Sequence, residues 1–179
     1  MHKVLKKLYR DHAHFIQLMD IFEGELDKYS NGGELASELV TDVIDYIDHY
    51  ADNIHHPIED QLYQAQLARS DKGREILEKL LVQHQVLMTL TKEFKRAFAA
   101  NAQGTAVSPD EVVQKGRDYI VQQRNHLKFE ENDAFPLLKD ELSDKDFDIA
   151  AGALPDEEDP LMDSHLKDNY PTLAERLAS

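Results

Sequence analysis

Apolar residues recur every three to four positions over four long stretches of the chain, which is the spacing of one face of an α-helix. The pattern predicts helices over about residues 3–29, 34–68, 74–103 and 109–141. Short turns at residues 30–33, 69–73 and 104–107 separate them, and no segment alternates in the manner of a strand. Because short connections make consecutive helices antiparallel, the fold is predicted to be all-α, an up-down-up-down four-helix bundle.

Two prolines fall inside the predicted helices. Pro57 lies within the second helix, and Pro136 lies near the end of the fourth. A proline removes one backbone hydrogen bond, and its ring clashes with the preceding turn. We therefore predict a kink or a break at Pro57 and a bend in the last turn at Pro136.

The last part of the chain has a different character. Residues 143–154 predict one short helix, residues 155–160 form an acidic linker, and residues 161–179 are polar, with Leu166, Leu173 and Leu177 as candidate anchors. We divide the chain into a bundle domain, residues 1–142, and an acidic C-terminal extension of helical and irregular structure, residues 143–179. Three alternatives stay open here: the extension packs on the bundle, contacts a protein partner, or stays mobile.

The composition excludes several kinds of function. The 179 residues include no Cys, 9 His, and 35 acidic against 20 basic residues, for a net charge of -15. Without Cys there is no disulfide framework, no iron–sulfur ligation and no thiol catalysis, which suits a reducing cytoplasm. So acidic a surface repels nucleic acid and anionic membranes, and we expect neither as a partner. No stretch approaches the roughly 20 apolar residues of a membrane span, and we do not expect the N-terminus to act as a signal peptide.

Each predicted helix carries one histidine in phase with its apolar face. These four are His12, His55, His84 and His126. Two of them have a glutamate one helical turn later, on the same face: Glu59 follows His55, and Glu130 follows His126. Two buried carboxylates without compensation are strongly unfavourable, so the pattern favours a cation in the helical interior.

The predicted ligands indicate a metal centre but do not identify the metal. Imidazole and carboxylate ligands suit iron, manganese or zinc. Six ligands exceed the four of one tetrahedral zinc and fit two ions about 3.5–4 Å apart. The Glu-x-x-His pairs of ferritin-like bundles are absent. The other internal histidines, His14, His49 and His56, are expected on the surface, since His49 and His56 share a face that differs from that of His55.

Four motifs together carry a family resemblance: DHAHF, HHPIEDQLY, LVQHQVL and HLKFEENDAFPLL, one on each predicted helix. In this combination the chain resembles a hemerythrin-like domain, also called the HHE cation-binding domain, over about residues 1–142. The resemblance implies two iron ions, Fe2+ or Fe3+, with an oxo or hydroxo bridge. It implies as metal ligands His12, His55, Glu59, His84, His126 and Glu130, with Glu131 as the alternative to Glu130.

The resemblance also implies binding of O2 or NO. Classical hemerythrins have a second histidine on the third helix, where this chain has Met88, which leaves fewer imidazoles on one iron. This favours sensing, storage or iron handling over simple oxygen carriage. One alternative is a di-iron redox enzyme or repair factor acting on NO or peroxide. Another is a helical interaction module with a structural metal site and an acidic tail that contacts a protein. Enzymatic turnover stays open, and a binder of metal and diatomic ligand is favoured over a fast enzyme.

Overall fold

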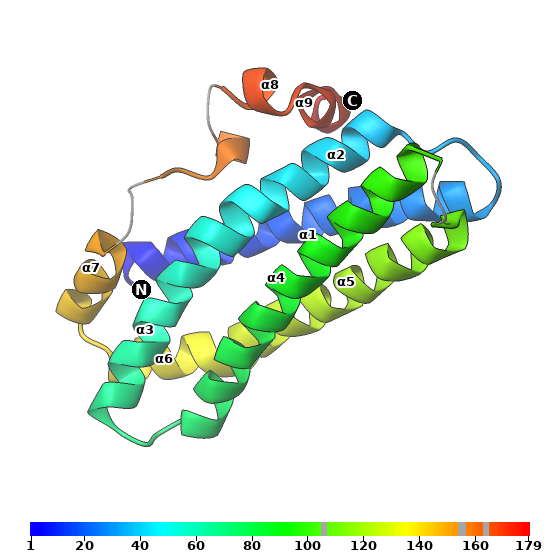
Figure 1. Ribbon diagram of the computed structural model, residues 1–179. Helices are drawn as coiled ribbons and strands as arrows, with labels where there is room; N and C mark the ends of the chain where they lie inside the picture. The colour runs from blue at the N-terminus through cyan, green and yellow to red at the C-terminus, as the bar shows by residue number, and fades with distance from the viewer. Residues whose placement is uncertain (105–106, 154–156, 163–164) are drawn as a thin grey trace.

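The protein is all-helical over the residues that its computed structural model describes, which are 1–104, 107–153, 157–162 and 165–179. The first three long helical segments are α1 (Lys3–Ser30), the continuous run of α2 (Ser37–Tyr46), η1 (Ile47–His55) and α3 (His56–Arg69), and then α4 (Arg74–Ala102). The fourth joins α5 (Pro109–Phe129), η2 (Glu130–Ala134) and α6 (Phe135–Glu141). These segments match the four predicted helices and lie alongside one another (Figure 1).

The interior between these segments is filled by large apolar side chains. Leu8, Phe22, Leu80, Phe94 and Ile120 are each no more than 1% exposed. The rings of Phe22 and Phe94 meet edge to face with 4.9 Å between their centroids. Complete burial of a side chain of this size contributes about 1.5–3 kcal/mol, so the apolar stripes read from the sequence account for the packing of the helices.

Local sequence sets where the helices begin. The Ser108 side chain accepts a hydrogen bond from the backbone N–H of Glu111 at the start of α5. Gly73 precedes α4 with a φ of 76°, a left-handed conformation that favours glycine. A Cβ atom on Gly73 would also meet the Leu137 side chain at 2.0 Å. The left-handed φ therefore favours glycine in the turn between α3 and α4, and a larger residue would also displace the Leu137 side chain.

Two stretches of π-helix, η1 and η2, interrupt the α-helical hydrogen bonding. Each ends two residues before a proline, Pro57 or Pro136. A proline ring clashes with the carbonyl four residues earlier, and those carbonyls, at Asn53 and Asn132, both lie within the π-helical stretches. The wider π-helical turn relieves this clash. The break predicted as one outcome at Pro57 is therefore wrong, because the helical run continues from Ser37 to Arg69.

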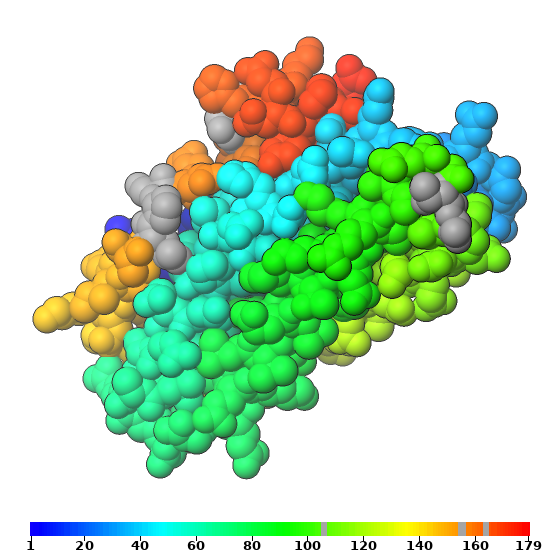
Figure 2. Space-filling view, viewed as in Figure 1, coloured from blue at the N-terminus to red at the C-terminus, as the bar shows by residue number. Residues whose placement is uncertain are grey.

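The C-terminal extension packs on the outside of the long helices. Helix α7 (Asp144–Gly152) contacts α3 and α1, and after the short turns η3 (Pro160–Met162) and α8 (Leu166–Asn169), helix α9 (Pro171–Leu177) contacts α2. Figure 2 shows α8 and α9 standing on the face formed by α2. Of the candidate anchors, Leu173 is fully buried. Residues 154–156, which include part of the predicted acidic linker, lie outside the described residues.

Candidate metal centre

Histidine and glutamate side chains from all four long segments meet in the interior. They are His12 from α1, His55 from the end of η1, His56 and Glu59 from α3, His84 from α4, His126 from α5 and Glu130 from η2, and none is more than 3% exposed. The structure thus brings together all six residues predicted from the sequence and adds His56.

The carboxylate of Glu59 lies in the middle of this cluster. Its Oε1 atom is 3.1 Å from Nε2 of His55 and 3.5 Å from Nε2 of His12. Its Oε2 atom is 3.5 Å from Nε2 of His84. Donor atoms of His12, His55 and Glu59 lie within 4.8 Å of one another, as do those of a second group. That second group comprises His56, Glu59, His84 and His126, so Glu59 is common to both.

Glu130 also spans the two groups. Its Oε1 atom is 3.1 Å from Nε2 of His126 and 3.3 Å from Nε2 of His84, and its Oε2 atom is 3.3 Å from Nε2 of His12. The hydroxyl of Tyr63 donates a 2.6 Å hydrogen bond to Oε1. Burial and the charge of Glu130 raise the pKa of Tyr63 well above its ordinary value, so this hydroxyl remains a donor.

The second ring nitrogen, Nδ1, of every histidine in the cluster faces a polar side chain outside it. The pairs are His12 with Glu131 (3.1 Å), His55 with Asp11 (3.2 Å), His56 with Asp52 (3.4 Å), His84 with Asp60 (2.6 Å) and His126 with Gln83 (3.0 Å). Partners of this kind fix the orientation of an imidazole and leave its Nε2 atom for a metal. Glu131, the alternative ligand, therefore holds the outer side of a ring, and Glu130 occupies the centre.

The buried carboxylates change the protonation of the histidines. Burial alone would lower the pKa of His84, but hydrogen bonds with Asp60 and Glu130 outweigh it and raise the pKa to about 10. The pKa values of His12 and His55 are also raised, because neighbouring carboxylates again outweigh burial. When no metal is bound, His84 is therefore protonated at neutral pH, and the carboxylates favour the protonated form of His12 and His55.

The pKa values of His56 and Glu59 are lowered instead. Burial and the charge of His84 lower the pKa of His56 to about 4, so this ring is neutral at pH 7. Burial and the Glu130 charge would raise the pKa of Glu59, but the contacts with His55 and His12 outweigh them and lower it to about 2. Glu59 is therefore ionised at neutral pH.

The cluster contains several buried polar atoms without a hydrogen-bond partner. They are Nε2 of His12, His55 and His56, both Oε atoms of Glu59, and Oε2 of Glu130. Buried polar atoms are nearly always paired, and an exception calls for a physical explanation. All six are side-chain atoms at the ends where the residues of the cluster face one another. Imidazole with carboxylate is a donor set that iron, manganese and zinc accept. The residues present therefore fit a metal centre.

His56 is the member that the sequence analysis missed. The expectation that it lies on the surface is wrong, since its side chain is 3% exposed and its ring stacks on that of His84 at 4.4 Å. Adjacent residues on a regular α-helix point about 100° apart, but the π-helical turns of η1 bring both His55 and His56 inward. His56 thus adds a fifth imidazole to the cluster. His49 is exposed as expected, whereas the His14 side chain is only 20% exposed.

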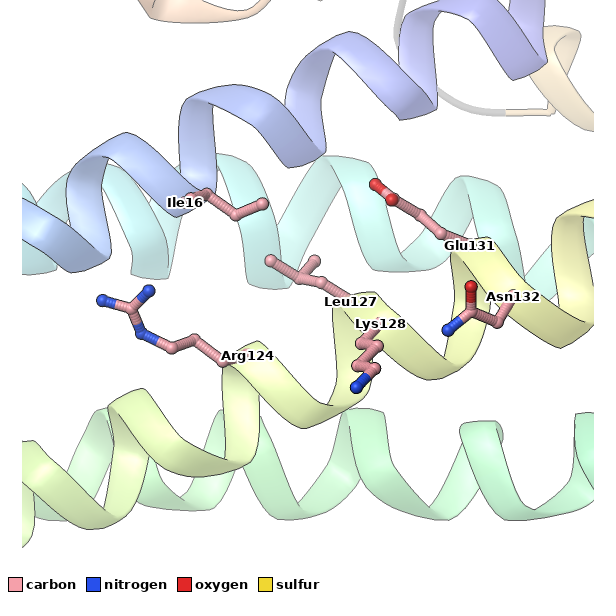
Figure 3. A pocket seen from close by; sticks show the side chains of 6 residues that line it. All are labelled: Ile16, Arg124, Leu127, Lys128, Glu131 and Asn132. Atoms are coloured by element: carbon pink, nitrogen blue, oxygen red, sulfur yellow. The ribbon is translucent and has the colours of Figure 1, made fainter.

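A surface pocket of about 300 Å³ lies beside the cluster, between α1 and α5 (Figure 3). Ile16 and Leu127 point toward each other across it, and Arg124 and Lys128 add positive charge at its edge. Glu131 both lines this pocket and contacts His12. Glu131 therefore connects this pocket to one histidine of the cluster.

The fold and this cluster define an all-helical protein with a buried histidine–glutamate group able to hold metal. The family model of the Hemerythrin HHE cation binding domain matches residues 3–138, and the chain belongs to this family. The resemblance read from the sequence is thereby confirmed, and binding of cations follows from it. Neither the curated proteins nor the solved structures gave a match. Over the described residues, no helix has the length and apolar character to cross a membrane.

Proposed function

We propose that this chain is a non-haem di-iron protein that binds O2 or NO in sensing, storage or iron handling. Residues 1–142 would form the up-down-up-down four-helix bundle, and residues 143–179 the extension. The metal ligands would be His12, His55, His56, Glu59, His84, His126 and Glu130. The observation that carries the proposal is the convergence of their Nε2 and carboxylate atoms, six of them unpaired, in one buried place.

Two ions are favoured over one by the donor set. The cluster offers five imidazole nitrogens and two carboxylates, more than one tetrahedral or octahedral ion accepts. The donors also fall into two groups that share Glu59. A carboxylate common to two groups suits a pair of ions held close together. Iron, when bound, would supply reversible binding of a diatomic ligand and exchange of electrons with it.

The surrounding residues suit binding in a dry, rigid place. Phe15 meets the edge of His55 at 4.8 Å, and Phe135 lies 5.0 Å from His12, so apolar rings exclude water on this side. The Tyr63 hydroxyl, held on Glu130, is a fixed hydrogen-bond donor within the cluster. All the proposed ligands lie on helices, which hold a site more precisely than loops do. These features favour a binding protein and assign no catalytic residue.

Metal analysis of the purified protein tests the proposal. About two iron ions per chain are expected, with an absorption spectrum that differs between reduced and aerated protein and changes with azide or NO. His55→Ala and His126→Ala should lose metal, while His165→Ala, at a position 68% exposed, should keep it. Zinc as the sole native metal, or unchanged iron in the first two variants, would contradict the proposal.

A further inference from the structure

One acidic residue of the C-terminal extension lies in the interior of the protein. Asp159 is 0% exposed. Its Oδ1 atom accepts a 2.6 Å hydrogen bond from the hydroxyl of Tyr46 and a 2.8 Å hydrogen bond from the backbone N–H of Leu161. Its Oδ2 atom is 2.5 Å from Nδ1 of His14. A buried carboxylate is tolerated only with partners of this kind, so Asp159 fixes the extension to α1 and to the end of α2.

Further contacts hold the extension along the same side of α2 and η1. The backbone N–H groups of Thr172 and Leu173 both donate to Oδ2 of Asp42, at 2.8 and 3.0 Å. Glu157 pairs with His49 of η1 at 2.7 Å. We call residues 157–162 and 165–177 the strap. Figure 1 shows it passing from α7 to the outer side of α2, and it lies beyond the part of the chain matched by the family model.

Buried rings connect the strap to the metal centre. The ring of Tyr46 lies 6.2 Å from that of Phe15, which in turn meets the edge of His55. Tyr46 also contacts Tyr50 at 5.7 Å between ring centroids. The Tyr50 hydroxyl donates a 3.0 Å hydrogen bond to Asp11, the residue that faces Nδ1 of His55. Two packed connections therefore run from the strap to one proposed ligand.

We propose that the strap is a positioning element for the metal centre. By holding Tyr46 immediately before η1, it maintains the π-helical turn that directs His55 and His56 into the cluster. π-Helical turns are rare and are often found at functional sites. Because the π-helical conformation is less favourable than the α-helical one, we expect contacts from outside the helix to hold it in place. This inference rests on the proposed metal centre, and it gives a function to the part of the chain that lies outside the family match.

Titration of Co2+ into the metal-free, full-length protein tests this role. Asp159→Ala and Tyr46→Phe are expected to weaken Co2+ binding by about tenfold and to shift the ligand-field absorption bands. Asp168→Ala removes the same charge from the strap at a side chain that is 77% exposed, and it should change neither. Thermal unfolding of each metal-free variant reports the stability of the fold separately.

Two results would overturn the inference, and they are distinguishable. If the wild-type protein binds Co2+ and both variants keep its affinity and its absorption bands while melting at lower temperature, the strap only stabilises the fold. If the wild-type protein itself binds no Co2+, the metal centre fails together with the inference. Tyr46→Phe removes a single hydroxyl, so the test stands even where Asp159→Ala does not fold.

Discussion

Metal binding is expected to release about three protons at pH 6.5. The pKa values of His12, His55 and His84 are raised above the ordinary 6.5, that of His84 to about 10, so these rings carry protons in the metal-free protein. A metal ion binds only the neutral imidazole. His56 releases none, because its pKa is lowered to about 4.

The size of the effect follows from the number of protons. Each proton released makes the overall association constant about tenfold stronger per pH unit. Three protons give about a thousandfold per pH unit near pH 6.5, equivalent to about 4 kcal/mol for complete loading. Asp60→Asn removes the carboxylate that holds Nδ1 of His84, and it should reduce the release toward two protons.

Isothermal titration calorimetry in two buffers of different ionisation enthalpy counts these protons directly. Co2+ added to the metal-free protein should give about three for the wild type and fewer for Asp60→Asn. Asp168→Asn, the same change at an exposed side chain, should match the wild type. Release of less than one proton at full metal stoichiometry would show that the rings are neutral without metal and would refute the reasoning.

Three further predictions concern single residues and pH. His56→Ala should lower the metal content by about one ion per chain, because one of the two donor groups loses an imidazole. Elemental analysis measures the metal content, and an unchanged content would exclude His56 as a ligand. Glu131→Gln should retain both ions and bind them about tenfold more weakly, since its carboxylate lies against Nδ1 of His12 and not against Nε2. Equilibrium metal titration measures the affinity, and loss of an ion would make Glu131 a ligand. The free energy of unfolding of the metal-free protein should fall between pH 6.5 and pH 10. The pKa of His84 is about 10 in the folded protein and 6.5 in the unfolded chain, so its protonation stabilises the fold fully below pH 6.5, and this contribution is lost as the pH rises through about 10. Denaturant unfolding across this range measures it, and a flat profile would contradict it.

The apolar spacing of the sequence was sufficient to predict the helices and six members of the cluster. A histidine in phase with a stripe such as Leu8 and Phe15 must face the core if the helix is regular, and His12 does so. His56 could not be predicted in this way, because the period of an α-helix does not describe η1. Pro57 was the available signal, and both π-helical stretches end two residues before a proline.

The outer partners of the histidines depend on contacts between helices that no local pattern contains. Asp60 and His84 lie on different helices 24 residues apart, and Glu131 and His12 are separated by 119 residues. The burial of Asp159 was even harder to predict from the local sequence, since an acidic segment ordinarily indicates a solvated surface. Its burial depends on Tyr46 and His14, 113 and 145 residues earlier in the chain.

The charged imidazoles around Glu59 and Glu130 have a consequence for how the protein matures. Small zinc domains collapse only when their ion arrives, because nothing else neutralises their ligands. In this chain the protonated His84 ring, whose pKa is raised to about 10, offsets buried negative charge before any metal binds, so we expect the helices to fold without the metal. Metal binding would then follow folding as a separate step, and it would depend on pH because the metal replaces the proton.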